Sequence, residues 1–421
     1  MNPVVNLIVN PPVNLPASTS VNTSVNTSVN PATTTTRDLL ATLIAFDTTS
    51  SRSNLELIRW IEAYLAKHGV ASSLTFNAEG TKANLYATIG PTDVPGICLS
   101  GHTDVVPTTG QPWTADPYTV VERDGKLFGR GTCDMKGFIA CVLAAVPSFV
   151  AGVRDIPIHL AFSYDEEVGC VGVRGLLAAL ADAPVKPMAV IIGEPTLMHV
   201  ARGHKGKQAY RVVVEGRAGH SALTHLGVNA IEYACDLISF LRNKANSLRD
   251  DGPHDEAFEP AYTTIQTGKV SGGIAINVIP ERCEFDFEIR YLPTDDVVAM
   301  IDEVSTFARE TVEPQMRVVD PACGVHFQRI SAYPGLQGRN AHGLQSFCCA
   351  LTGFKDTITL SFGTEGGLFE AMDIPAIVCG PGSIEQAHRP DEFIALEQLA
   401  RCDQFMQDLL AQIATPGFEL K

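Results

Sequence analysis

The sequence lacks a long hydrophobic run. No stretch reaches the roughly eighteen uninterrupted apolar residues that a membrane-spanning helix needs, so we expect no membrane span. The first 36 residues repeat Val-Asn with Thr, Ser and Pro and carry no charged side chain. With no basic start and no apolar centre they make a poor signal peptide. We predict a disordered tail over residues 1–36, because this composition buries too little apolar surface to fold.

Basic residues and paired cysteine motifs are also scarce. Lys and Arg total 31 against 47 Asp and Glu, which gives a formal charge of −16. This balance disfavours nucleic acid and anionic membranes as partners and favours small cations. The 11 cysteines never occur in Cys-x-x-Cys spacing, and several lie inside apolar runs. They indicate buried thiols in a reducing compartment, and hence a cytoplasmic protein, rather than a disulfide framework.

What the sequence does contain is a regular alternation of strand and helix patterns. A chain of 421 residues with 45% hydrophobic content fits a globular protein of two or three domains. From residue 37 the alternation predicts an α/β fold, with a mainly parallel sheet flanked by helices. At residue 206 the order becomes β-α-β-β-α-β, which suggests an inserted ferredoxin-like α+β domain. We expect catalytic-domain segments at 37–206 and 321–421, separated by an inserted lid domain at 207–320.

Polar side chains follow several of the expected parallel strands. We predict these strands at 96–100, 158–163, 189–192 and 376–379, and a helix from about residue 137. The candidate residues at their ends are His102, Asp104, Asp134, Glu166, Glu167, Glu194 and His388. The carboxyl ends of parallel strands meet at one edge of a sheet, so these side chains are expected to converge. Acids gathered there repel one another unless cations neutralise them.

The residue types at this edge suit a zinc site. Histidine nitrogens and carboxylate oxygens are common zinc ligands, and two ions that share one carboxylate account for more ligands than one tetrahedral ion needs. Glu166 is then left free to act as a base. Taken singly, each residue has a simpler interpretation: Glu166 and Glu167 fit a solvated loop, and His388 fits a surface histidine. Only the combination favours a metal site.

Four motifs in this sequence resemble those of a known family. They are Ser-Gly-His-Thr-Asp-Val-Val-Pro at 100–107, Gly-Arg-Gly-Thr-Cys-Asp-Met-Lys-Gly at 129–137, Asp-Glu-Glu-Val-Gly at 165–169 and Gly-Arg-Ala-Gly-His-Ser at 216–221. The family is that of the dizinc amidohydrolases and exopeptidases, which includes acetylornithine deacetylase, succinyl-diaminopimelate desuccinylase, aminoacylase and the glutamate carboxypeptidases. The resemblance runs from about residue 37 to the C-terminus.

This resemblance implies a ligand set for two zinc ions per subunit, with Co²⁺ as a possible substitute. His102 and Glu194 would hold one ion, Glu167 and His388 would hold the other, and Asp134 would bridge them. A cis peptide bond is also implied directly after Asp134.

The resemblance further implies roles beyond the ligands. Asp104 would orient His102, and Glu166 would take a proton from the metal-bridging water and pass it to the leaving amine. His220, in the inserted domain, would reach the active site of a second subunit and stabilise the oxyanion, which implies a homodimer formed through the inserted domains.

Other segments bear on the substrate, which is expected to be a small N-acylamino acid. Residues 201–206, 361–366 and 380–392 look most like the acetylornithine deacetylase branch, which deacetylates N2-acetyl-L-ornithine to L-ornithine and acetate. Arg290 would bind the α-carboxylate, Asn277 would hydrogen-bond the same group, and Glu365 would pair with the δ-ammonium of ornithine.

Several alternatives stay open. Two glycines follow Glu365, where the branch has alanine and a bulkier residue, so the pocket is also compatible with N-acetylcitrulline or another acetylamino acid. A desuccinylase, aminoacylase or dipeptidase of the same family is the next alternative. A non-catalytic metal-binding interaction domain would be expected to have lost a ligand or the base, and this chain keeps all of them.

Overall fold

A computed structural model describes residues 35–420 of the chain. Nearly all of the predicted disordered tail lies outside the described residues. Folded structure begins one residue earlier than expected, because Thr35 caps helix α1 (Thr36–Ile44) in a reciprocal capping box with Asp38. No helix in the described part of the chain combines the length and the apolar character that crossing a bilayer requires.

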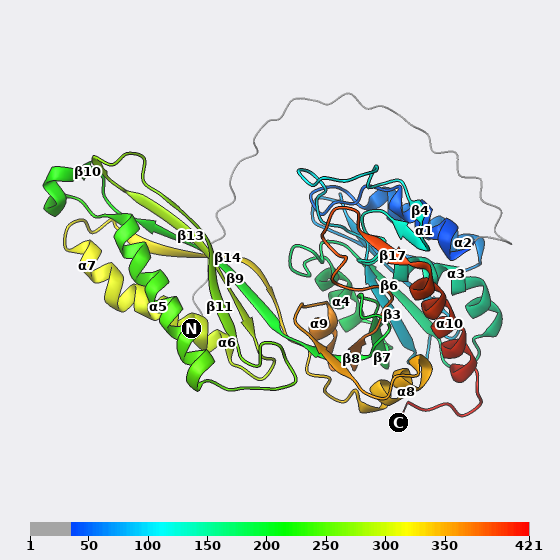
Figure 1. The fold of residues 1–421 in the computed structure, drawn as a ribbon. Coiled ribbons are helices and arrows are strands. Elements are labelled where there is room, and N and C mark those ends of the chain that lie inside the picture. Colours follow the sequence, from blue (N-terminus) through cyan, green and yellow to red (C-terminus); the bar gives the residue numbers. More distant parts are fainter. Residues whose placement is uncertain (1–34, 421) are drawn as a thin grey trace. The chain divides into compact units, whose positions relative to one another are not determined.

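An eight-stranded sheet forms the larger layer of the structure (Figure 1). Its spatial order is β1 (Ser72–Phe76), β2 (Ala83–Ile89), β6 (Ile158–Ser163), β3 (Ile97–His102), β7 (Ala189–Ile192), β16 (Ala376–Val378), β8 (Ala201–His204) and β15 (Ile358–Leu360). The four central strands β6, β3, β7 and β16 are mutually parallel. The predicted α/β class with a mainly parallel sheet is therefore confirmed.

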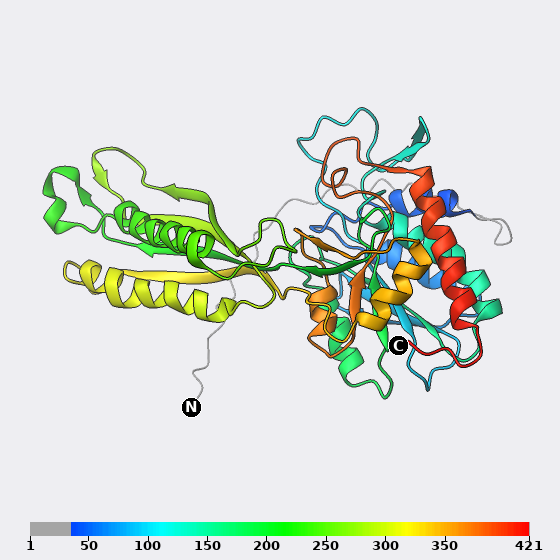
Figure 2. The same cartoon turned by 60° about the horizontal axis from the view of Figure 1, so that its bottom comes forward.

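Helices cover both faces of this sheet because its strands are apolar on both sides. In β3, Ile97 and Leu99 belong to one core, whereas Cys98 between them belongs to the other. The first core is completed by α1, α2 (Leu55–Lys67), α3 (Lys136–Gly152), α8 (His342–Thr352) and α10 (Leu396–Ile413). The second is completed by α4 (Val173–Ala181) and α9 (Gly366–Glu370). Figure 2 shows α8 beside α10.

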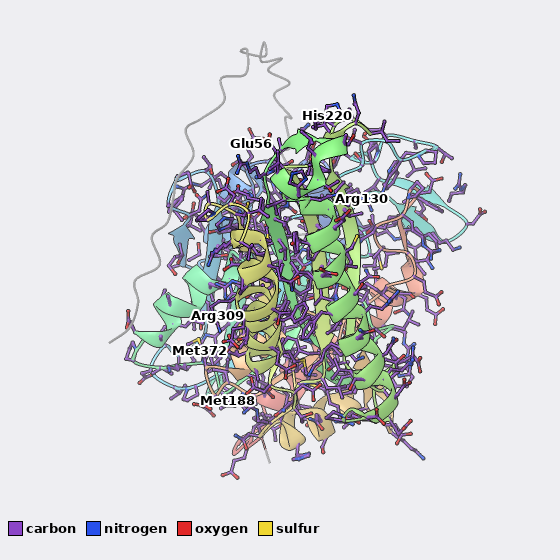
Figure 3. The ribbon with its side chains drawn as sticks, turned by 90° about the vertical axis from the view of Figure 1, so that its left-hand side faces the viewer. Glu56, Arg130, Met188, His220, Arg309 and Met372 are labelled. Carbon is purple, nitrogen blue, oxygen red and sulfur yellow. The ribbon has the colours of Figure 1, made fainter. Side chains whose placement is uncertain are left out.

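Residues 206–333 form a second, antiparallel sheet with its own core. Its strands are β11 (Thr264–Gly272), β13 (Arg282–Tyr291), β9 (Gly206–Glu215) and β14 (Gly324–Tyr333), in that spatial order. The helices α5 (Ala230–Asp251) and α6 (Val297–Phe307) follow β9 and β13, so the ferredoxin-like arrangement is confirmed. Alternate residues of β13, such as Phe285 and Phe287, face this core. Figure 3 looks onto the helical side of this domain.

Shorter elements complete the chain. Helix α6 continues through a π-helical turn η2 (Ala308–Val312) into α7 (Glu313–Arg317). A two-stranded ribbon joins β10 (Gly219–His220) to β12 (Val278–Ile279), next to the 3₁₀ segment η1 (Ser221–Leu226). A three-stranded sheet joins β4 (Val121–Arg123), β5 (Lys126–Phe128) and β17 (Phe393–Ala395). This last sheet bears directly on the candidate site.

The inserted domain extends further than its predicted boundary at residue 320. Strand β14 pairs with β9 from Gly324 to Tyr333, so it belongs to the inserted sheet. The sequence did not indicate this strand because many of its side chains, such as Gln328 and Arg329, are exposed and the alternation is weak. Strand β14 therefore belongs with the inserted sheet, and the next strand of the eight-stranded sheet is β15, which begins at Ile358.

We predict that Phe285→Ala destabilises the inserted domain by about 3–5 kcal/mol, because its side chain is 1% exposed and its removal leaves a cavity. Urea unfolding and hydrogen exchange in β9 and β13 measure this loss. The matched control is Ile330→Ala, on a side chain of β14 that is 51% exposed, which should change stability by less than about 0.5 kcal/mol. Equal effects from both substitutions would contradict the assignment of this core.

Candidate metal and active site

His102 is fixed by its position at the end of the central strand β3. Its Nδ1 donates to the main-chain carbonyl of Asp104 at 2.9 Å. The other ring nitrogen, Nε2, lies 3.0 Å from Oδ1 of Asp134 and 3.4 Å from Oε1 of Glu194. A histidine that donates through Nδ1 presents the lone pair of Nε2, which is the form that binds a metal ion.

The carboxylate of Asp104 does more than the sequence suggested. It lies 3.5 Å from Nδ1 of His102, so the carbonyl of the same residue makes the shorter contact. The carboxylate accepts hydrogen bonds from Ser50 Oγ at 2.7 Å and from the amides of Glu166 at 3.1 Å and Glu167 at 3.3 Å. Asp104 thus ties the loop after β6 to the loop after β3.

Asp134 lies between two imidazoles. Its Oδ1 faces His102, and its Oδ2 lies 3.3 Å from Nε2 of His388. The same nitrogen of His388 is 3.0 Å from Oε2 of Glu167. The peptide bond between Asp134 and Met135 is cis. The five candidate ligands therefore form two groups that share Asp134.

Burial and mutual repulsion shift the acids of this cluster. Burial, followed by the negative charge of Asp134, raises the pKa of Glu167 to about 7 and that of Glu194 to about 7. For Asp134 burial acts in the same direction, but hydrogen bonds with His102 and His388 outweigh it and hold the pKa below its usual range. Hydrogen bonds with Asp134, and then with Glu167, raise the pKa of His388 to about 10.

The donor set fits divalent metal ions. Ligand atoms of His102, Asp134 and Glu167 lie within 4.8 Å of one another, and so do those of His102, Glu166 and Glu194. Imidazole nitrogen combined with carboxylate oxygen is a donor set that zinc accepts. Positive ions at this position would also relieve the repulsion among the buried acids.

Glu166 is buried beside the candidate ligands, and its side chain lines a cavity next to them. Its Oε1 accepts a weak hydrogen bond from Cys170 Sγ at 3.2 Å. Burial, with a further contribution from the charge of Glu194, raises the pKa of Glu166 well above its usual range. A carboxylate raised in this way is suited to accept and return a proton near neutral pH.

The cavity in front of these acids has a volume of about 140 Å³, which suits a small molecule. The inserted sheet contributes Lys207, Arg290 and Tyr333 to the lining of the same cavity. Arg290 Nη1 donates to the hydroxyl of Tyr333 at 2.8 Å, and its Nε lies 3.3 Å from Glu288. Two cationic side chains therefore line the same cavity as the candidate metal ligands.

His220 and Asn277 lie outside this cavity in the same chain. Lys207 of β9 pairs with Arg290 of β13 at the end of these strands that borders the cavity. His220 lies beyond the other end of β9, where it pairs with Val278. The intervening strand spans roughly 30 Å at about 3.3 Å per residue. Within one chain, Asn277 and Arg290 therefore do not reach one carboxylate, which corrects that expectation.

Glu365 also lies away from the cavity wall. Its carboxylate is 1% exposed and accepts hydrogen bonds from Ser100 Oγ at 3.3 Å and from Ser163 Oγ. Ser100 lies within β3, two residues before its end, and Ser163 is the last residue of β6. Burial raises the pKa of Glu365 to about 7. An ion pair between Glu365 and a substrate ammonium, as the sequence suggested, would require this carboxylate to leave both serines.

Sequence reasoning missed several residues of the site. Ser50 is a small polar residue with no motif around it, so nothing indicated its bond to Asp104. Tyr333 ends the strand that was not recognised. Lys207 directly follows residues 201–206, and the sequence alone does not show that it is the cross-strand partner of Arg290.

Because the acids repel one another, we predict that divalent cations stabilise the protein. Zinc at about 100 times its dissociation constant should raise the free energy of unfolding by about 2.7 kcal/mol. Thermal unfolding with a chelator and with added zinc measures this change. Glu194→Gln should reduce the zinc-dependent shift, whereas Glu56→Gln, at an exposed position of α2, should leave it intact. Equal midpoints with chelator and with zinc would contradict a metal site here.

Comparison with known proteins agrees with the geometry. The family model described as "Peptidase family M20/M25/M40" matches residues 98–412. Acetylornithine deacetylase of Photorhabdus laumondii subsp. laumondii is 33% identical over 377 residues, which cover 89% of this chain and 95% of that protein.

Solved structures share the fold. An M20 family metallo-carboxypeptidase from Sulfolobus solfataricus superposes with a TM-score of 0.74 at 15% identity, covering 90% of this chain and 99% of that chain. A dinuclear metal binding peptidase of the M20 family from Bacillus subtilis gives a TM-score of 0.61 at 16% identity, covering 89% and 96%. The matched family model spans most of the chain, so the protein belongs to the M20/M25/M40 peptidase family and is a metallohydrolase of that family.

Proposed function

We propose that this protein is a zinc-dependent amidohydrolase that converts N2-acetyl-L-ornithine and water to L-ornithine and acetate. The observation that carries the proposal is that the Asp134 carboxylate lies between the imidazoles of His102 and His388. Glu166 lines the same cavity and is not one of the five proposed ligands. Curated relatives between 31% and 34% identical to this chain are named acetylornithine deacetylase, which supports the choice of substrate.

Two zinc ions per subunit would be held by the candidate ligands, with Co²⁺ as a possible substitute. His102 and Glu194 would hold one ion, Glu167 and His388 the other, and Asp134 both. When bound, zinc lowers the pKa of water toward about 7 and polarises a carbonyl oxygen.

The chain's own residues would move the protons. Glu166 would accept a proton from the attacking water as the oxygen bonds to the acetyl carbon. It would then give that proton to the amine nitrogen as the carbon–nitrogen bond breaks. The second proton of the water stays on the acid product until that product ionises to acetate, and it leaves to the amine or to solvent. Asp104 would support this transfer indirectly, because it holds the amide of Glu166.

The inserted domain would supply substrate contacts. Arg290, with Lys207 beside it, would bind the α-carboxylate of the acylamino acid. The distance of His220 and Asn277 from their own cavity supports an action on the cavity of a second subunit. His220 of the partner subunit would then stabilise the oxyanion, and the protein would be a homodimer formed through its inserted domains.

The cysteines support a cytoplasmic location. Nine of the 11 cysteines are buried, and all are free thiols in the structure. Burial raises the pKa of thiols such as Cys141 and Cys379 well above the usual range, which keeps them protonated and unreactive. Thiols of this kind suit a reducing compartment.

A second candidate substrate is an N-acetylamino acid with an uncharged side chain, such as N-acetylcitrulline. The acids that line the cavity in the described part of the chain are Asp134, Glu166, Glu167 and Glu194, and all of them have roles at the metal site. Among the described residues, no further acid lines the cavity to pair with a δ-ammonium, and Glu365 is held by two serines.

We predict that Glu166→Gln lowers kcat by about 10²–10⁴-fold, because an amide cannot accept the proton. Metal content should equal that of the wild type, as measured by elemental analysis of the same preparation. Glu56→Gln, an exposed substitution, serves as the control and should keep full turnover. A Glu166→Gln variant with near wild-type kcat would remove Glu166 from the role of base.

Turnover of N-acetylornithine, N-acetylcitrulline and succinyl-diaminopimelate by the wild type separates the candidate substrates. The proposal predicts the highest kcat/KM for N-acetylornithine. Arg290→Met should raise KM for each substrate, because all of them carry a carboxylate, by about 10-fold or more for the loss of a charge-assisted pair. A higher kcat/KM for N-acetylcitrulline would select the second candidate, and an unchanged KM in the variant would argue against the carboxylate contact.

A further inference from the structure

Two segments of the chain that carry candidate metal ligands lie beside each other. Strand β17 pairs with β5, and the ladder continues where the amide of Gly129 donates to the carbonyl of Glu392 at 2.9 Å. The first segment continues from β5 to Asp134. The second runs from His388 into β17. These ligands are more than 250 positions apart in the sequence, so some contact must fix their relative position.

The side chain of Glu392 makes this contact at the first segment. Its Oε1 accepts from the amides of Cys133 at 2.9 Å and Asp134 at 3.1 Å. Its Oε2 accepts from the amide of Gly131 at 3.0 Å and from Arg130 Nη1 at 2.7 Å. Four donors thus occupy the acceptor positions of one carboxylate that is 1% exposed.

Arg130 extends the contact to the segment that carries His388. Its Nη1 also donates to the carbonyl of Arg389 at 3.3 Å, and its Nη2 donates to Oε1 of Gln111 at 2.5 Å. Gln111 in turn donates through Nε2 to the carbonyl of His388 at 2.9 Å. The guanidinium, labelled in Figure 3, is 1% exposed and lies over the ring of Trp113 at 5.0 Å.

We infer that Glu392, Arg130 and Gln111 form a positioning network that sets the distance between Asp134 and His388, and with it the metal affinity of the site. This inference rests on the proposed function, because it assumes that these two residues bind metal. None of the three network residues is itself a ligand in the proposal. Groups that orient metal ligands in this way commonly contribute 10–100-fold to metal affinity.

The carboxylate of Glu392 cannot be replaced by an amide without loss. In Glu392→Gln, the side-chain nitrogen must face either two main-chain amides or the amide of Gly131 and Arg130, and it can accept from neither. The buried guanidinium also loses its countercharge, which is costly in this environment. Gln111→Ala is milder, because Gln111 is only half-buried. Its loss removes the contact with the His388 carbonyl and one acceptor of Arg130, but leaves all four hydrogen bonds of the Glu392 carboxylate in place.

The test is a titration of zinc and Co²⁺ into apoprotein, followed by calorimetry and by the visible absorption of Co²⁺. Glu392→Gln should weaken both metal equivalents by about 10–100-fold, because Asp134 serves both. Gln111→Ala should weaken one equivalent and leave the other unchanged, with an unaltered melting temperature of the apoprotein. Asp286→Asn, which breaks the ion pair with Arg211 on the inserted sheet, controls for lost charge and should bind both equivalents like the wild type.

The outcomes separate this inference from the proposed function. If Gln111→Ala binds both equivalents with wild-type affinity, the positioning role is refuted, even where Glu392→Gln fails to fold. Equal weakening by Asp286→Asn would likewise refute it, because the effect would then follow from general destabilisation. A wild type that binds no metal would instead refute the proposed function itself.

Discussion

Buried negative charge is the constraint on which the catalytic domain depends. Four carboxylates, those of Asp134, Glu166, Glu167 and Glu194, lie together where water is largely excluded. Removing such charges from water is expensive, and two imidazoles supply less positive charge than four ionised acids carry. The arrangement is consistent with bound cations, and the fold serves to hold the acids together in spite of their repulsion.

The parallel sheet provides that restraint through its connections. At the same edge of the sheet, β3 ends at His102, β6 leads to Glu166 and Glu167, and β7 leads to Glu194. Hydrophobic cores on both faces of the sheet hold these strands in place. Helix α3, which follows Asp134, is apolar around nearly its whole circumference and packs against α1 and α10. Asp104 and Glu392 then fix the intervening loops by accepting main-chain amides.

The parts of this structure that could be predicted from the sequence are those with a strong local signal. Apolar strands that end in His102, Glu166 or Glu194 place these residues at a sheet edge by topology alone. Strand β14 gave no such signal because four of its ten residues are exposed and they do not alternate with buried ones.

Roles that depend on long-range contacts could not be predicted in the same way. An acid such as Glu392, two residues after Pro390, has the sequence context of a solvated loop residue, and only its pairing with Arg130 shows otherwise. The same holds for Glu365, whose two serine partners come from separate strands. Asn277 and Arg290 are only 13 positions apart in the sequence, yet an extended strand separates them.

Anomalous diffraction from zinc-loaded crystals, recorded at the zinc edge, tests the central claim most directly. The account predicts two peaks about 3.5–4 Å apart on either side of Asp134, one next to His102 and Glu194 and the other next to Glu167 and His388. A single peak, or two peaks that do not share Asp134, would contradict it.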